Sequence, residues 1–151
     1  MEKIASFTVD HTKLTPGIYL SRQDGDITTY DIRMRRPNCE EVIDNASLHT
    51  IEHLFATFAR NSEAADKVIY FGPMGCRTGC YFLVRDMKKE DAVALIRRVF
   101  EEIAAYDGEI PGASAKECGN WREHSLEGAK KEAVRFLSVI QNWTAEQLGY
   151  Q

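Results

Sequence analysis

Residues 17–34 carry the pattern that most restricts the fold. Two segments, GIYLSRQ and DITTYDIRM, are rich in β-branched and aromatic residues and flank the dipeptide Asp24-Gly25. Asp-Gly between two such segments is typical of a hairpin turn, because these residues tolerate the positive φ angles that the turn requires. A turn this short joins antiparallel strands. The sequence therefore predicts an antiparallel pair early in the chain.

Later segments predict further strands and three helices. Short strands are expected at residues 5–11, 66–74 and 80–86, the last two around a glycine-rich loop. A helix is expected from a cap at Asn45 or Ser47 to about Ser62, and another over residues 125–140 with Ser125 as its cap. Residues 88–106 predict an amphipathic helix, because five apolar residues recur at helical spacing: Val93, Ile96, Val99, Phe100 and Ile103.

This mixed order predicts one α+β domain over residues 1–151, with a mostly antiparallel sheet packed against helices. With 44% apolar residues, a chain of 151 residues can bury a substantial core. A net charge of -4 gives no basic surface for nucleic acid or anionic membranes. The sequence shows no apolar run of signal-peptide or membrane-spanning length. We therefore expect a cytoplasmic protein without nucleic-acid or membrane partners.

The segment SLHTIEHLFATFAR, residues 47–60, places two histidines four residues apart. On a helical wheel of about 100° per residue, the apolar residues from Leu48 to Ala59 form one broad face. His49 and His53 lie together on roughly the opposite side, where two imidazoles at i and i+4 can bind one ion. Glu52 cannot share that position, but it can reach a water or a substrate oxygen on the metal.

His49 to His53 form the H-x-x-E-H pattern, the inverted version of a zinc-protease motif. Taken alone, it leaves three alternatives open. The helix face is simply solvated, or the protein is a metallopeptidase in which Glu52 activates a water and a late glutamate is the third ligand. Otherwise, the site is a structural zinc centre with four protein ligands. A catalytic centre needs three protein ligands and an open position, so the motif is one ligand short.

Four cysteines are available for chemistry, and none of their spacings forms C-x-x-C. In a reducing cytoplasm, metal binding or catalysis is a better explanation for them than disulfides. Cys76 lies between Gly75 and Arg77, where a small neighbour exposes the thiol and a cation favours the thiolate. A tight turn with an incidental thiol fits the same residues equally well. Cys118 precedes the last helix and is an ordinary loop cysteine by its spacing alone.

Six segments, in this order, resemble the S-ribosylhomocysteine lyase (LuxS) family, which makes the precursor of autoinducer-2. They are SFTVDHTKL, GIYLSR, TYDIRMRRPN, SLHTIEHLFATFAR, GPMGCRTG and ECGNWREHSLEGAK. The resemblance runs from about residue 4 to residue 140. It is far more specific than the five-residue histidine motif.

The resemblance implies a compact α+β homodimer with two active sites at the subunit interface. It implies one divalent metal per subunit, iron(II) in the native state and often zinc or cobalt in preparations. The implied residue roles follow the matching motifs: metal ligands His49, His53 and Cys118; catalytic residues Glu52 and Cys76; substrate contacts Ser6, His11 and Arg33. Three residues depart from the family pattern without touching these groups: Gly72, Cys80 and Trp121. We interpret Cys80 as a small hydrophobe that fills a strand position.

The implied reaction cleaves S-ribosylhomocysteine to homocysteine and 4,5-dihydroxy-2,3-pentanedione. A thioether leaves readily only when it is β to a carbonyl whose α-proton can be removed. The carbonyl must therefore move from C1 through C2 to C3 by two enediolate steps before homocysteine leaves C5. Such steps need a Lewis acid for the oxyanions and groups that act as base and then as acid. We expect Glu52 and a Cys76 thiolate, with a pKa lowered by Arg33 or Arg77, to move the protons.

Overall fold

The computed structural model describes residues 1–151 and contains a four-stranded antiparallel sheet with the strand order β1-β2-β4-β3. The expected hairpin is confirmed, with Gly25 in its turn at a φ of 60°. The two strands expected around the glycine-rich loop are also confirmed. They pair with each other, and the second of them also pairs with β2 along the full length of β2. The strands are β1 (Gly17–Asp24), β2 (Ile27–Arg33), β3 (Val68–Pro73) and β4 (Gly79–Arg85).

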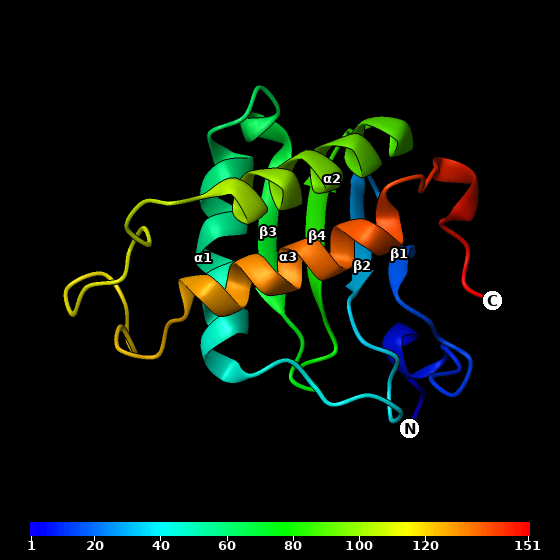
Figure 1. The fold of residues 1–151 in the computed structure, drawn as a ribbon. Helices are drawn as coiled ribbons and strands as arrows, with labels where there is room; N and C mark the ends of the chain where they lie inside the picture. The colour runs from blue at the N-terminus through cyan, green and yellow to red at the C-terminus, as the bar shows by residue number, and fades with distance from the viewer.

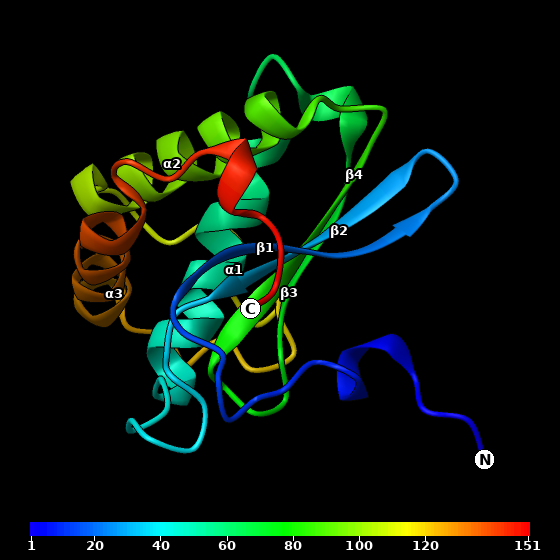
Figure 2. The ribbon, with the colours of Figure 1, turned by 90° about the vertical axis from the view of Figure 1, so that its right-hand side faces the viewer.

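Three helices cover one face of the sheet (Figure 2). They are α1 (Asn45–Arg60), α2 (Lys89–Ala105) and α3 (Leu126–Ile140). Phe55 of α1 stacks on Phe71 of β3, with ring centroids 3.9 Å apart, and meets Phe82 of β4 edge-on at 5.0 Å. The five apolar positions predicted for α2 are all buried in the same core. The α+β architecture expected from the sequence is therefore confirmed.

The start of α1 is fixed by Asp44, whose carboxylate accepts a hydrogen bond from the Ser47 backbone N–H at 2.9 Å. The expectation that Asn45 or Ser47 caps this helix is therefore wrong by one to three residues. Ser125 caps α3 as predicted, because its hydroxyl accepts from the Gly128 N–H at 3.0 Å. The two helix starts touch: a Cβ added at Gly128 would come within 1.9 Å of Ser47 Oγ.

Residues 5–11 form no strand, which corrects the expectation for this segment. A short 3-10 helix, η1 (Ala5–Phe7), opens it, and Thr8 closes the turn by donating to the Ala5 carbonyl from both its backbone N–H and its hydroxyl. Asp10 then accepts hydrogen bonds from Thr12. These local bonds satisfy part of the backbone of a segment that pairs with no strand.

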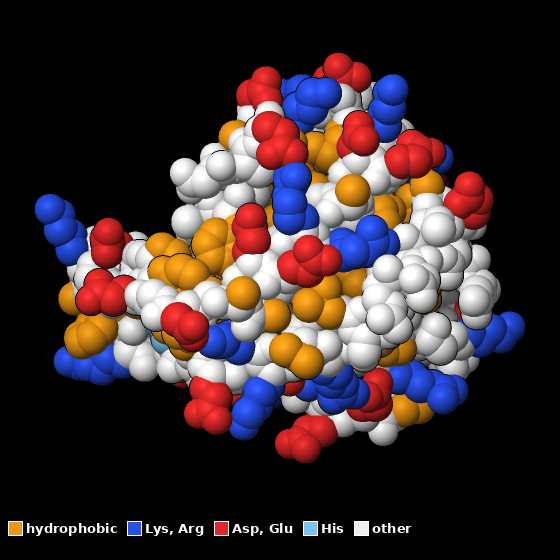
Figure 3. Space-filling model, turned by 45° about the horizontal axis from the view of Figure 1, so that its top comes forward, with side chains coloured by type: hydrophobic (Ala, Val, Ile, Leu, Met, Phe, Trp, Pro, Cys, Tyr) orange, Lys and Arg blue, Asp and Glu red, His pale blue; other side chains and the backbone are white.

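The segment between α2 and α3, residues 106–125, extends as a long loop beside α1 (Figure 1). The sheet face opposite the helices carries the N-terminal segment (Figure 2) and, against Asp31, Tyr150 near the C-terminus. None of the three helices covers this face, and we call it the open face. On the face in Figure 3, acidic and basic side chains are interspersed with small apolar areas, as the mild net charge leads us to expect. None of the helices is long and apolar enough to cross a membrane.

Candidate metal centre and active site

Four side chains with metal-binding atoms meet where α1 packs against the loop before α3. They are His49, His53, Cys118 and His124, and their ligand atoms all lie within 4.8 Å of one another. Cys118 Sγ is 3.4 Å from His49 Nε2 and 3.9 Å from His53 Nε2. The structure thus brings together the three residues that we expected to be ligands, although one of them comes from a distant loop.

Backbone carbonyls of the long loop fix the orientation of both α1 imidazoles. His49 Nδ1 lies 2.9 Å from the Glu123 carbonyl oxygen, and His53 Nδ1 lies 2.8 Å from that of Pro111. Because a carbonyl only accepts, each Nδ1 carries the proton and each Nε2 keeps its lone pair for an ion. Gly112, at a φ of 72°, lets the loop approach, since a Cβ there would lie 3.2 Å from His53 Nδ1.

His124 is a fourth donor that our sequence analysis missed. Thr50 Oγ1 donates to the Ala46 carbonyl, so it accepts from His124 Nδ1 at 2.9 Å. The Nε2 atom of His124 is then an acceptor, and it is buried without any hydrogen-bond partner. Burial, together with the charges of His49 and His53, lowers the pKa of His124 to about 4, so the ring is neutral at pH 7. The only feature of the sequence that draws attention to His124 is its position directly before the helix cap Ser125.

The donor set fits a divalent transition metal. Ligand atoms about 2.0–2.3 Å from a shared tetrahedral ion lie roughly 3.5 Å apart, close to the two sulfur–nitrogen separations observed here. The Asn120 backbone N–H donates to Cys118 Sγ at 3.4 Å. Two imidazoles with one thiolate suit zinc, cobalt or iron rather than magnesium or calcium. This set also replaces the late glutamate ligand that a metallopeptidase would require.

Cys76 lies in the loop between β3 and β4 and lines an open cavity of about 590 Å³. The three residues expected to contact substrate line the same cavity: Ser6 of η1, His11 of the turn that follows, and Arg33 at the end of β2. Neither Glu52 nor any of the four metal-binding side chains lines it. The expected site residues therefore form two groups within one chain, a metal group and a Cys76 group.

The surroundings of Cys76 favour its thiolate. Arg33 Nη1 donates to Thr78 Oγ1 at 2.8 Å, which leaves the Thr78 hydroxyl proton free for Cys76 Sγ at 3.1 Å. Burial raises the pKa of Cys76, but the hydrogen bonds from Thr78 and the charge of Arg33 outweigh it, so the pKa lies below its ordinary value. Arg77 instead donates to the Ile43 carbonyl, which singles out Arg33 as the cation.

Comparison with known proteins identifies the family. The family model described as S-Ribosylhomocysteinase (LuxS) matches residues 4–147. A relative named S-ribosylhomocysteine lyase, from Borreliella burgdorferi strain ZS7, is 51% identical over 156 residues, with 99% of each chain covered. Relatives with the same name from Clostridium beijerinckii and Finegoldia magna are 52% and 53% identical, again with 99% of each chain covered. The chain belongs to the LuxS family.

Two of the three departures from the LuxS pattern have a clear place in the structure. Cys80 is fully buried in the core, which agrees with its interpretation as a small hydrophobe. Burial raises the pKa of its thiol, and the charges of Glu52 and Asp31 add to this effect. Trp121 is 39% exposed on the long loop, under the guanidinium of Arg122 at 4.9 Å.

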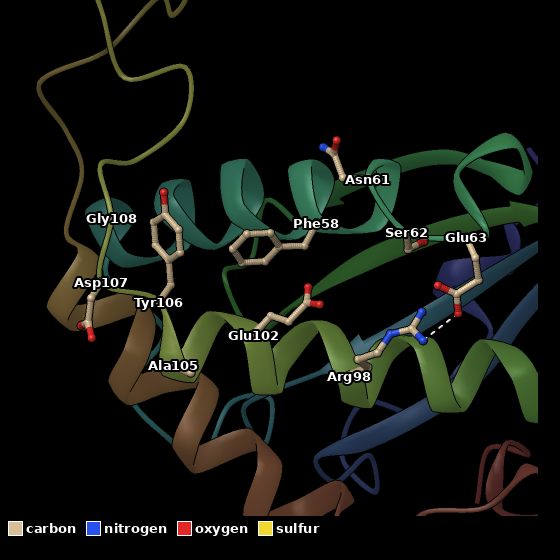
Figure 4. A pocket seen from close by; sticks show the side chains of 10 residues that line it. All are labelled: Phe58, Asn61, Ser62, Glu63, Arg98, Glu102, Ala105, Tyr106, Asp107 and Gly108. Carbon is tan, nitrogen blue, oxygen red and sulfur yellow. Dashed lines mark hydrogen bonds and ion pairs between the residues drawn. The ribbon is translucent and has the colours of Figure 1, made fainter.

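A second cavity, of about 680 Å³, lies between the ends of α1 and α2 (Figure 4). Its lining includes Phe58, Tyr106, Glu102 and the surface ion pair between Arg98 and Glu63. None of the LuxS site residues lines this cavity, and it holds neither a cysteine nor a histidine. Although this cavity is larger than the one beside Cys76, its lining does not make it a candidate for the site of LuxS chemistry.

Proposed function

We propose that this protein is a metal-dependent S-ribosylhomocysteine lyase that releases homocysteine and 4,5-dihydroxy-2,3-pentanedione, the autoinducer-2 precursor. The observation that carries the proposal is the meeting of His49, His53 and Cys118, in a chain whose relatives bear the lyase name. The product homocysteine would return to methyl-group metabolism. The pentanedione would supply a signal of the quorum-sensing type.

His49, His53 and Cys118 would hold a divalent metal, which would supply a Lewis acid for the substrate's carbonyl and hydroxyl oxygens. We propose iron(II) in the cell, with zinc or cobalt able to replace it, because this ligand set suits all three ions. The neutral Nε2 of His124 lies within 4.8 Å of the other three donor atoms and can accept a hydrogen bond from a substrate hydroxyl. We therefore assign His124 a supporting role, and the metal would keep an open position for substrate.

Glu52 and Cys76 move the protons in this proposal. Glu52 lies on α1 beside the ligand His53 and acts on carbon acids next to the migrating carbonyl. Cys76 approaches from the β3–β4 loop as a thiolate, which Thr78 and Arg33 stabilise. Removal of a proton from C4 by one of these groups expels homocysteine from C5, so cleavage consumes no water.

The cavity around Cys76 suits the polar parts of the substrate. Ser6 and His11 line it from the N-terminal segment and can contact the hydroxyl groups or the amino-acid end. Arg33 uses Nε and Nη2 on Asp31 but directs Nη1 toward Thr78 and Cys76. Its contact with substrate would therefore be made near the reacting carbons.

We further propose a homodimer in which the open sheet faces meet. The open face carries exposed apolar groups, including Tyr70 at 55% exposure and Phe7 at 70%. Tyr81 and Leu83 of β4 line a cavity of about 410 Å³ there, together with Ile4 and Ser6. A second copy over this face would enclose the Cys76 cavity. We place the enzyme in the cytoplasm, because its free cysteines need a reducing compartment.

A thiol assay with three proteins tests the lyase proposal. Metal-loaded wild type should release homocysteine from S-ribosylhomocysteine, whereas Cys76→Ala and Glu52→Gln should each lose at least about a hundredfold in rate, typical of a lost acid–base group. Both variants should retain one metal per chain, since neither residue is a ligand. The exposed Cys39 lies outside both groups, so Cys39→Ala is the matched control and should match wild type. Metal-loaded wild type that releases no homocysteine would refute the proposal.

A specific observation also favours a structural metal site as the second candidate. His124 brings the number of protein donors to four, which is the count of a closed centre. In that case metal removal would unfold the chain, and substrate would find no open position. Metal content in a His124 variant separates the two candidates, as the Discussion describes.

A further inference from the structure

The segment after α3, residues 141–151, runs back along the edge strand β1. Trp143 Nε1 donates to the Ile18 carbonyl at 3.0 Å, and the Leu20 N–H donates to the Leu148 carbonyl at 2.8 Å. Gly17 makes room for the indole, since a Cβ there would lie 2.3 Å from Trp143. These contacts fix the path of the segment and deliver Tyr150 to the open side of the sheet.

Tyr150 ends this path against a buried carboxylate. Its hydroxyl donates to Asp31 Oδ2 at 2.7 Å, and its ring stacks on Tyr19 with centroids 5.2 Å apart. Burial and the charge of Asp31 raise the pKa of Tyr150, so the phenol stays protonated and remains a donor at every relevant pH. The contact joins residues 119 positions apart.

Asp31 in turn accepts hydrogen bonds from Arg33 with both of its carboxylate oxygens. Arg33 Nε donates to Oδ1 at 3.1 Å and Nη2 donates to Oδ2 at 2.7 Å, and both side chains are no more than 3% exposed. The remaining nitrogen, Nη1, donates to Thr78 Oγ1 and lies 4.0 Å from Cys76 Sγ. A two-point contact fixes the plane of the guanidinium, so Asp31 decides where Nη1 points.

We propose that Tyr150 is a positioning residue for Cys76, which it serves by holding the Asp31 carboxylate in the orientation that keeps Arg33 directed at the thiol. The inference rests on the proposed function in that Cys76 is the reacting thiol. Two consequences of losing the hydroxyl have the same sign. The Asp31 carboxylate loses one of the contacts that fix its orientation, and the orientation of Arg33 becomes less well fixed with it. The Asp31 charge also loses a donor that offsets it, and both changes make the Cys76 thiolate less favourable.

Other titratable groups face Cys76 from the elements around its cavity and must be considered. His11 comes from the N-terminal turn, Glu40 from the loop after β2, and Tyr81 and Cys80 from β4. None of them contacts Tyr150 or Asp31 by a hydrogen bond. A change confined to the Tyr150 hydroxyl therefore reaches Cys76 through Asp31 and Arg33.

The test is the pH dependence of Cys76 alkylation by iodoacetamide in the metal-loaded protein, followed on the Cys76 peptide by mass spectrometry. Tyr150→Phe keeps the ring and removes only the donor. We expect its alkylation midpoint to lie higher than in wild type by roughly half to one pH unit, which makes alkylation about three- to tenfold slower below the midpoint.

Tyr19→Phe is the matched control, because it removes a hydroxyl from the stacked partner ring, and that hydroxyl donates to the Thr15 carbonyl instead. Its midpoint should equal that of wild type. A Tyr150→Phe profile that superposes on wild type, or an equal shift in Tyr19→Phe, would overturn the inference. The readout needs no substrate, so a missing lyase activity would refute the proposed function without deciding this one.

Discussion

Cys118 Sγ lies 3.4 Å from His49 Nε2, although 69 positions separate the two residues. The contact exists because the long loop after α2 returns to α1 and places its Pro111 and Glu123 carbonyls on the two α1 imidazoles. The same backbone that orients the histidines therefore also delivers the thiolate. A change that displaces this loop should therefore also weaken metal binding.

Metal content should distinguish ligands from neighbours. Cys118→Ala and His49→Ala each leave two proposed ligands and should lose bound metal on dialysis, whereas His124→Ala keeps three and should retain one metal per chain. In a cobalt-loaded sample, the thiolate-to-metal absorption should persist in His124→Ala and vanish in Cys118→Ala. If His124→Ala loses its metal as completely as His49→Ala does, the site is closed and structural, and the proposed open position is wrong.

The lyase rate should rise with pH through the titration of Cys76. A thiol must be deprotonated to accept a proton, so the rate falls as the pH drops below its pKa. Because Thr78 and Arg33 lower that pKa, the midpoint should lie below the ordinary value of about 8.5. Thr78→Val keeps the shape of the side chain but removes the hydroxyl that lies between Arg33 and Cys76. It should move the midpoint of the rate profile upward by about one pH unit. An unchanged midpoint would show that the Thr78 hydroxyl does not lower the pKa of Cys76.

The buried ion pair between Arg35 and Glu132 should matter for stability. Arg35 Nη1 donates to Glu132 at 2.7 Å, and this pair ties the loop after β2 to α3 with side chains only 7% and 15% exposed. Glu132→Gln leaves the guanidinium without its counter-charge and should lower the free energy of unfolding by about 3 kcal/mol.

Glu63→Gln is the control for that measurement. The Arg98–Glu63 pair in Figure 4 has the same nitrogen–oxygen distance of 2.7 Å, but it is a single contact and its side chains are 43% and 76% exposed. Its loss should change the free energy of unfolding by less than about 0.5 kcal/mol. Urea titration of both variants gives the comparison, and equal effects would show that burial does not set the value of these pairs.

Cys80 should contribute to the free energy of unfolding but not to lyase activity. It is fully buried in the core, and burial raises its thiol pKa. Cys80→Ala should keep full lyase activity and lower the free energy of unfolding by about 1 kcal/mol through a small cavity. Native protein should leave Cys80 unalkylated while Cys76 reacts. A loss of activity in Cys80→Ala with retained metal would give this thiol a role in the reaction.

The sequence predicted the elements well where local patterns decide them. The Asp24-Gly25 hairpin, the apolar positions of α2 and the Ser125 cap were all found as expected, because each depends on neighbours a few residues apart. Residues 5–11 were misassigned to a strand. Their alternation of residue types carries no information about whether a free sheet edge lies within reach.

The site shows the same limit more sharply. The helix motif identified His49 and His53, but spacing alone did not select Cys118, which required the family resemblance. Neither the helix motif nor the family resemblance identified His124. Its place in the cluster depends on Thr50 of α1, which lies 74 positions away and fixes its tautomer. The choice of Arg33 over Arg77 as the cation beside Cys76 likewise depends on backbone geometry that no motif encodes.

The products of cleavage test the central claim most directly. Metal-loaded protein is incubated with S-ribosylhomocysteine, homocysteine is measured by its thiol, and the dicarbonyl is trapped with an aromatic 1,2-diamine for quantification by mass spectrometry. The account predicts equal amounts of homocysteine and 4,5-dihydroxy-2,3-pentanedione, because elimination consumes no water. Homocysteine accompanied by ribose in place of the pentanedione would mean hydrolysis and would contradict the lyase mechanism.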